Sequence, residues 1–220
     1  WTQNIVFSLF IVGIVLSVVR IIFMAVLAAV QRKKEKQAIN PPVNTSRQYP
    51  FVTIIVPAYN EEINAVRTVN NLLQQTYPSL RIIFVDDGSR DSTFVKVSTA
   101  FARTPNIQVH TNPNGGKASA LNFGISLAVT DYVVCIDADT QLKSDAVMKL
   151  MEKFTAENIG AVAGNVKVGN EINMITRWQS IEYITSQNFD RRAFDLLNCI
   201  TVVPGAIGAF RKDAIIKSGG

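Results

Sequence analysis

The chain opens with a long apolar run that continues from Ile5 to Val30 and is interrupted by Arg20. About 20 apolar residues in a helix are enough to cross a hydrocarbon core roughly 30 Å thick. An arginine at mid-bilayer costs roughly 2.5 to 3.5 kcal/mol on insertion scales, so we place the span near residues 4–24, where Arg20 can reach an interface. A signal peptide is the alternative, but no basic stretch precedes the run and no small-residue cleavage site follows it. The pattern predicts a transmembrane helix within residues 1–31.

Beyond residue 50 the pattern changes to short apolar runs separated by polar turns. Runs of about four to eight β-branched or aromatic residues bounded by turn residues are typical of strands. The pattern predicts strands at residues 52–56, 81–85, 107–110, 132–136, 200–203 and 207–210.

Between these runs, apolar residues recur about every three or four positions, which is the period of a helix with one buried face. Asn60 and Ser144 are expected to cap the first and the fourth helix. Alternating strands and helices predict an α/β fold over residues 51–220, a mostly parallel sheet with helices on both faces. The last of these helices is a long helical stretch predicted over residues 172–197. The apolar residues at helical spacing are Ile63, Val66, Val69 and Leu73; Phe94, Val97 and Phe101; Ala118, Leu121, Ile125 and Ala128; Val147, Leu150, Met151 and Phe154; Ile172, Ile175, Trp178 and Ile181.

Charge is distributed unevenly along the chain, whose formal net charge is +5. The excess of lysine and arginine lies in residues 1–50, so the rest is neutral overall and lacks the basic face of a nucleic-acid binder. Nucleic acid is therefore excluded as a partner. Short Lys/Arg-rich flanks stay on the cytoplasmic side of a membrane, and Arg32 to Lys36 directly follow the apolar run. We expect a basic juxtamembrane segment and linker at residues 32–50 and a cytoplasmic domain at the cell (inner) membrane.

Cysteine and histidine offer little chemistry in this chain. Cys135 and Cys199 lie in apolar stretches without metal-ligand spacing, which predicts buried thiols in a reducing compartment. The single histidine, His110, ends a predicted strand and is expected to be structural. Neither a Ser/His/Asp nor a Cys/His arrangement can be assembled around these residues.

Acidic and amide side chains follow three of the predicted strands. In an open α/β sheet, ligands bind beyond the carboxyl ends of the strands. Carboxylates supplied from three strand ends therefore predict a binding site at one edge of the sheet. The residues concerned are Asn60, Glu61, Asp86, Asp87, Asp137 and Asp139.

The pair Asp137 and Asp139 is a candidate metal site. Alternate residues of extended backbone point the same way, so both carboxylates can face one cation that prefers oxygen ligands, either Mg²⁺ or Mn²⁺. A metal held by one or two carboxylates together with substrate phosphates would neutralise a diphosphate leaving group. A turn that caps a helix is the alternative interpretation.

A glycine pair precedes Lys117 at the start of a predicted helix, where backbone N–H groups and a lysine can meet a phosphate. The spacing is not that of a P-loop, and no strand leads into Gly-x-Gly-x-x-Gly. An ordinary loop is the alternative.

Four motifs together resemble glycosyltransferase family 2, which has the GT-A fold: Val56–Glu61, Asp86–Ser89, Gly115–Lys117 with Ala120–Asn122, and Asp137–Asp139. The resemblance implies inverting transfer of a sugar from a UDP-sugar, with Asp137 and Asp139 as the catalytic and metal-binding Asp-x-Asp pair. It further implies a nucleotide-sugar-binding set formed by Pro57, Ala58, Tyr59, Glu61, Asp86, Asp87, Lys117 and Asp137. Because Asp87 is expected at an exposed strand end, Asp87→Ala should weaken UDP binding with little loss of folding.

Within the family, the membrane span and the segments Gln179–Tyr183 and Val203–Arg211 are similar to the processive β-glycan synthases, above all those that make poly-β-1,6-N-acetylglucosamine. This similarity implies an N-acetylglucosamine donor, a growing glycan as acceptor, and a membrane setting with room for further membrane subunits. It places Gly205 and Gly208 in a loop near the acceptor, although an edge hairpin explains the two glycines equally well.

The family's general base lies in a Thr-Glu-Asp-like motif, followed by a Gln-x-x-Arg-Trp motif, and the printed sequence contains neither. An inverting transfer needs a base for the acceptor hydroxyl. We therefore expect the base beyond Gly220, and expect this chain to bind UDP with a divalent metal but to transfer no sugar. The alternatives are a polyprenyl-phosphate glycosyltransferase, a non-catalytic nucleotide-sugar-binding membrane subunit, and a nucleotidyltransferase.

Overall fold

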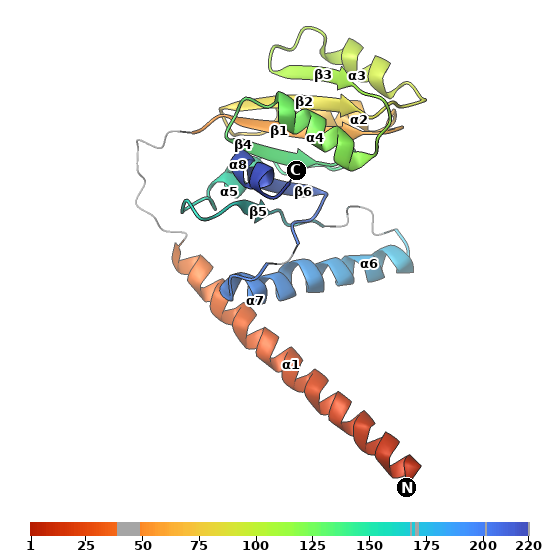
Figure 1. Cartoon of the computed structure of the whole chain (residues 1–220), viewed down its shortest axis with the longest axis vertical. Helices are drawn as coiled ribbons and strands as arrows, with labels where there is room; N and C mark the ends of the chain where they lie inside the picture. The colour runs from red at the N-terminus through yellow and green to blue at the C-terminus, as the bar shows by residue number, and fades with distance from the viewer. Residues whose placement is uncertain (39–48, 168, 170–171, 201, 220) are drawn as a thin grey trace. The chain divides into compact units, whose positions relative to one another are not determined.

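The polypeptide divides into two units in the computed structural model, which describes residues 1–38, 49–167, 169, 172–200 and 202–219 (Figure 1). The helical unit consists of Trp1–Ser46 and Asn165–Thr201, and the sheet unit consists of Arg47–Gly164 and Val202–Gly220. Residues 165–201, which the sequence placed in one domain with the sheet, group with the N-terminal helix instead. Most of the predicted linker lies outside the described residues.

The sheet unit is built on six strands in the order β3-β2-β1-β4-β6-β5. The first four are parallel, whereas β6 is antiparallel to both β4 and β5, so the sheet is mixed. The strands are β1 (Val52–Ala58), β2 (Leu80–Asp86), β3 (Ile107–Thr111), β4 (Tyr132–Ile136), β5 (Ala161–Ala163) and β6 (Ile207–Arg211).

Five of the six predicted strands are confirmed. The strand expected at 200–203 is absent from the described residues of that range, where Ile200 and Val202 are exposed rather than packed. The edge strand β5 escaped prediction because three residues are too few to show a period. The predicted alternation of strands and helices is therefore correct for the parallel strands β1 to β4. The antiparallel pairings involve β5 and β6, which come last in the chain.

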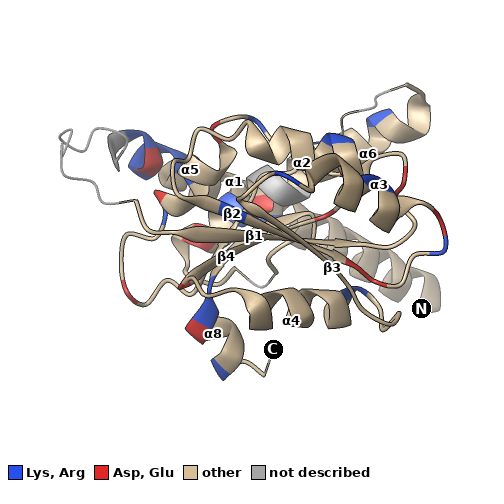
Figure 2. Cartoon of the chain, turned by 90° about the horizontal axis from the view of Figure 1, so that it is seen from above, with Lys and Arg blue, Asp and Glu red and all other residues tan. Residues whose placement is uncertain are grey.

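Helices cover both faces of the sheet, as predicted; Figure 2 shows α2 and α3 on one face and α4 and α8 on the other. The helix α4 approaches β1 closely at Gly124, where an added Cβ would lie 2.5 Å from Cγ2 of Ile55. Glycine thus allows α4 to pack tightly over the strand behind the site. The helices of this unit are α2 (Ala65–Leu73), α3 (Thr93–Phe101), α4 (Lys117–Leu127), α5 (Ala146–Met151) and α8 (Lys212–Lys217).

The buried face of α2 differs from the one predicted. Ala65, Thr68, Val69 and Leu72 are buried, whereas Ile63 is 85% exposed and precedes the helix. The predicted caps are also wrong. Asn60 has a φ of 56° and lies outside the helix, and the residue before α5 is Asp145 rather than Ser144. The spacing of apolar residues along the sequence predicted where these helices lie in the chain. It did not predict which face of each helix is buried.

The helical unit contains α1 (Thr2–Ala38), α6 (Met174–Ile184), a π-helical turn η1 (Thr185–Asp190) and α7 (Arg191–Leu196). Over Thr2–Lys36, α1 is long and apolar enough to cross a membrane, by length and composition. The helix continues through the basic run to residue 38, so the start of the predicted juxtamembrane segment is helical. The long helical stretch predicted after residue 172 is confirmed, and Asn173 caps it by accepting a hydrogen bond from the N–H of Thr176 at 2.9 Å.

Candidate active site

A cavity of about 260 Å³ lies in the sheet unit at the carboxyl ends of β1, β2 and β4. It brings together residues that are up to 82 positions apart in the chain. Every predicted nucleotide-sugar-binding residue except Asp86 lies in its wall. The lining consists of Pro57, Ala58, Tyr59, Glu61, Asp87, Lys117, Ala120, Asp137, Ala138 and Asp139.

The sheet itself opens this cavity. The pairing of β1 with β4 ends at Ile55 and Cys135, whereas β1 remains paired with β2 as far as Ala58 and Asp86. The chain runs outward from β1 through β2 to β3 and then crosses back to β4 on the other side of β1, which makes this a topological switch point. Pro57, which has no N–H to donate, is tolerated in a central strand because it follows the end of one ladder.

Asp87 organises the glycine loop before α4. Its carboxylate accepts hydrogen bonds from the backbone N–H groups of Gly115 at 3.1 Å and Gly116 at 2.8 Å, and from Nδ2 of Asn112 at 3.2 Å. Its own N–H donates to the carbonyl of Ala58 at 2.8 Å. At 2% exposure, Asp87 is buried, so the prediction of an exposed carboxylate is wrong. Its position lets it shape the cavity and hold the loop together.

Asp86 faces a different set of partners. Its Oδ2 accepts hydrogen bonds from the N–H of Ser89 at 3.2 Å and from the hydroxyl of Thr111 at 3.1 Å. The side chain is buried and does not line the cavity. The nucleotide role predicted for Asp86 thus stays a prediction, while the structure shows it joining the ends of β2 and β3.

Lys117 is the first residue of α4 and forms an ion pair with Oδ1 of Asp137. The two side chains are 48% and 31% exposed, so the pair lies at the cavity surface. Gly205 lies against the same lysine: a Cβ there would be 2.9 Å from Nζ of Lys117. The absence of a side chain at this position leaves the lysine room in the cavity.

Asp137 and Asp139 reach the cavity through a turn. β4 ends at Ile136, and the N–H of Thr140 donates to the carbonyl of Asp137 at 3.0 Å. The extended backbone assumed from the sequence is therefore wrong, although both carboxylates line the cavity as predicted. The buried Ala138 lies between them, and Asp139 is exposed.

The residues present fit a divalent cation only in part. Within the described parts of the chain, no group of three or more His, Cys, Asp or Glu side chains is arranged to hold a metal ion. Two aspartates on one turn can supply one or two oxygen ligands, and the remaining ligands would come from substrate phosphates and water, as is common for Mg²⁺. Asp137 and Asp139 are the residues that would hold such an ion.

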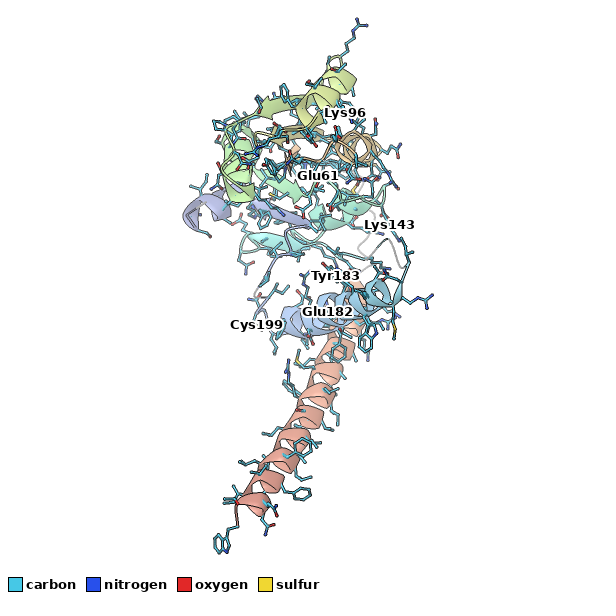
Figure 3. All side chains as sticks on the ribbon, turned by 90° about the vertical axis from the view of Figure 1, so that its right-hand side faces the viewer. Glu61, Lys96, Lys143, Glu182, Tyr183 and Cys199 are labelled. Atoms are coloured by element: carbon cyan, nitrogen blue, oxygen red, sulfur yellow. The ribbon has the colours of Figure 1, made fainter. Side chains whose placement is uncertain are left out.

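The opposite wall of the cavity is formed by the segment after β1. The half-exposed ring of Tyr59 provides an aromatic surface. Glu61, labelled in Figure 3, donates its N–H to the hydroxyl of Thr93 at 2.8 Å and accepts from Nδ2 of Asn64 at 3.1 Å. Asn60 accepts from the N–H of Arg90 at 2.8 Å. These bonds connect the loops after β1 and β2 and fix the wall.

Gly208 and the two cysteines do not line the cavity. Gly208 lies within β6, paired with Cys135 and Ala163, so the predicted loop position and the edge-hairpin alternative are both wrong for it. Burial raises the pKa of the Cys135 thiol to about 12, so it stays protonated and is no nucleophile at neutral pH. Cys199 is exposed, contrary to the prediction of a buried thiol.

Sequence reasoning missed four residues of the site. Ala120 and Ala138 line the cavity, Asn112 binds the carboxylate of Asp87, and Nδ2 of Asn114 donates to the carbonyl of Asp87 at 3.0 Å. The Asn-Pro-Asn-Gly run was the available signal, because asparagine beside proline and glycine favours turns whose side chains bind nearby backbone. Small alanines in a wall carry no such signal.

Comparison with known proteins gives a consistent result. The family model "Glycosyl transferase family 2" matches residues 53–219. The poly-beta-1,6-N-acetyl-D-glucosamine synthase of Staphylococcus aureus (strain COL) is 33% identical over 180 residues, which is 81% of this chain and 43% of the relative. That of Staphylococcus epidermidis is 32% identical over 171 residues, 77% of this chain and 41% of the relative. The chain therefore spans less than half the length of these relatives.

Among solved structures, the mannosyltransferase PcManGT from Pyrobaculum calidifontis, in complex with GDP-Man and Mn²⁺, superposes with a TM-score of 0.63. The match covers 91% of this chain and 58% of that one at 22% sequence identity. A likeness at this identity shows a shared fold.

Proposed function

Since this chain belongs to glycosyl transferase family 2, we propose that it binds a UDP-sugar and takes part in transferring the sugar, N-acetylglucosamine, to a growing β-linked glycan. The observation that carries the proposal is the cavity at the switch point of a GT-A fold, lined by Lys117, Asp137 and Asp139. The curated relatives, named as poly-beta-1,6-N-acetyl-D-glucosamine synthases, support the choice of sugar and product.

The charges of the cavity support a divalent cation. Its wall contains four carboxylates and one lysine, an excess of three negative charges. A diphosphate placed against this wall would be repelled unless a cation lay between them. Bound Mg²⁺ or Mn²⁺ would supply neutralisation of the diphosphate leaving group. Asp139 is available for this role because its carboxylate is exposed, while Asp137 is shared with Lys117.

The roles of the protein residues follow from their positions. Tyr59 offers a ring for stacking against a uracil base, and Asp87 positions the glycine loop that begins α4. Lys117 lies where it can contact the diphosphate and Asp137 together. During inversion, the acceptor hydroxyl would attack the anomeric carbon, the bond from that carbon to the diphosphate oxygen would break, and UDP would leave with the electron pair.

The proton of the acceptor hydroxyl needs a base within about 2.6 to 3.2 Å. The Asp87 carboxylate is already bound by two backbone N–H groups, and Asp137 is paired with Lys117, so neither is suited to the role. The basic residues after the apolar span would keep the cavity on the cytoplasmic side, where UDP-sugars are made.

Binding can be tested by calorimetry with UDP on the full chain in detergent, with Mn²⁺ or with a chelator. We expect the chelator to abolish binding. Asp139→Asn should weaken it by about tenfold to a hundredfold, as expected for a hydrogen bond or ligand contact to a charged group. Asp131→Asn is the matched control, because Asp131 is exposed at the opposite end of β4 and should leave binding unchanged. Metal-independent binding would overturn the assignment of the aspartate pair.

Transfer is tested separately with labelled UDP-N-acetylglucosamine and an oligosaccharide acceptor. Release of UDP with extension of the acceptor by the protein would support the proposal. Release of pyrophosphate would instead identify a nucleotidyltransferase, and a single sugar on polyprenyl phosphate would identify the lipid-linked alternative.

A further inference from the structure

A second hollow lies within the helical unit, where η1 and α7 pack against α1. Figure 1 shows α7 beside α1. Its volume is about 830 Å³. The packing that forms it is anchored by the buried residues Met24, Ala28 and Ala193. We call it the α1–α7 groove, and it is lined by Ala25, Ala28, Ala29, Arg32, Lys33, Lys36, Ile184, Phe189 and Arg192.

The two ends of this groove differ in chemistry. Ala25, Ala28 and Ala29 form an apolar wall on α1, and Ile184 and Phe189 face the groove from the other helices. One to three turns further along α1 come the cations Arg32, Lys33 and Lys36. From Ala25 to Lys36 the helix rises by about 16 Å, at about 1.5 Å per residue. A ligand that fills the groove must therefore combine an apolar part with an anionic one.

The cations of α1 are not neutralised by neighbouring acids in the part of the chain that the structure describes. Arg192, which lines the groove from α7, is paired with Glu35 at 2.6 Å and donates to Oε1 of Gln31 at 2.8 Å, so it holds α7 against α1. Asp195 accepts from Nε2 of Gln31 at 2.7 Å. No salt bridge joins Arg32, Lys33 or Lys36 to any described residue, which leaves three positive charges facing the groove.

We propose that the α1–α7 groove binds an anionic phospholipid, with the phosphate headgroup at Lys33, Lys36 and Arg32 and the start of an acyl chain along the alanine wall. Three observations favour a lipid over a soluble anion. The groove is continuous with the apolar surface of the candidate span, five of its lining residues are apolar, and the cations begin where the apolar run ends. Basic pockets beside membrane helices on the cytoplasmic side commonly bind anionic headgroups.

This inference depends on α1 lying in a membrane, and not on the identity of the transferred sugar. The test measures retention of phosphatidylglycerol and phosphatidylcholine by the delipidated full chain in detergent micelles, by native mass spectrometry over a lipid titration. We expect preferential retention of phosphatidylglycerol. A lysine beside an anionic lipid contributes about 1 kcal/mol, so Lys33→Gln with Lys36→Gln should weaken retention more than about tenfold.

Two further variants distinguish lipid binding in the groove from a diffuse electrostatic attraction to the basic run. Lys34→Gln is the matched control, because Lys34 lies in the same basic run but does not line the groove, and it should retain phosphatidylglycerol almost normally. Ala29→Phe fills the apolar wall without changing charge and should also weaken retention. UDP binding by each variant reports whether the sheet unit remains folded.

The proposal is overturned if Lys34→Gln weakens retention as much as the double variant, because the attraction would then be diffuse. It is equally overturned if both lipids are retained alike, if Ala29→Phe has no effect, or if inorganic phosphate at equal concentration displaces the lipid. The last result would identify a soluble-anion site.

Discussion

The sheet unit and the helical unit use similar apolar residues in opposite ways. The largest fully buried side chains, among them Phe84, Ile54 and Leu72, all lie in the sheet unit. Among the described side chains of the helical unit, the buried apolar ones are Met24, Ala28 and Ala193, whereas Phe10 and most of its neighbours on α1 are exposed. The first unit removes apolar surface from water by packing it on itself, and the second presents that surface outward.

Because of this difference, the two units are stabilised in different ways. The cavity lies in the unit that has its own interior, so its geometry is supported by buried strands and by α4. A lipid bilayer would be the natural solvent for the exposed apolar surface of α1, which is long and apolar enough to cross a membrane. Three measurements test this contrast, beginning with the largest expected effect.

The strongest test replaces one phenylalanine by alanine in each unit. Phe84→Ala removes a fully buried ring from β2 and should cost roughly 3 to 5 kcal/mol of unfolding free energy. Phe10→Ala removes a ring that is 65% exposed on α1 and should leave the sheet unit unchanged. Hydrogen exchange of β1, β2 and β4 in lipid nanodiscs measures both variants. Equal acceleration of exchange by the two substitutions would refute the contrast.

Replacing one aspartate in each unit should have a smaller effect on stability. Asp87→Ala leaves two glycine N–H groups and an asparagine amide without their acceptor and should destabilise the sheet unit by roughly 1 to 3 kcal/mol. This replaces the sequence-based expectation of little folding loss. The carboxylate of Asp195 in the helical unit is exposed, and water can replace the hydrogen bond that it accepts from Gln31, so Asp195→Ala should change stability by less than about 0.5 kcal/mol. Exchange rates in the glycine loop and α4 would show the difference; unchanged rates in the Asp87 variant would argue against the loop role.

The smallest effect concerns the surface ion pair of Glu62 with Lys96, which is labelled in Figure 3. The hydrogen bond from Lys96 lowers the pKa of Glu62 below its usual value. Because the folded pKa is lowered, the pair stabilises the fold above the unfolded pKa of about 4.3, and this stabilisation is lost as pH falls through the folded value.

Glu62→Gln should therefore lower the urea midpoint slightly at pH near 7, and the difference from the parent protein should vanish in acid. Glu157→Gln removes an exposed carboxylate from the same unit and serves as the control. A difference that persists or grows in acid would contradict the assigned direction of the pKa shift.

The sequence by itself determined the parallel strands, the α/β alternation, the long apolar helix and the family. These are local properties, because a strand such as 52–56 shows its burial in its own residues and a span needs only length and apolarity. The positions of Glu61, Lys117 and Asp137 in one cavity also followed, because the carboxyl ends of parallel strands meet at one edge.

Tertiary structure alone decided the rest, since each remaining feature depends on contacts between distant segments. The buried state of Asp87 arises from glycine N–H groups 28 and 29 residues away. The place of Gly208 in β6 depends on its pairing with β4 and β5. The α1–α7 groove exists because residues 184–192 pack beside a helix that ends about 150 positions earlier, and no local pattern encodes that meeting.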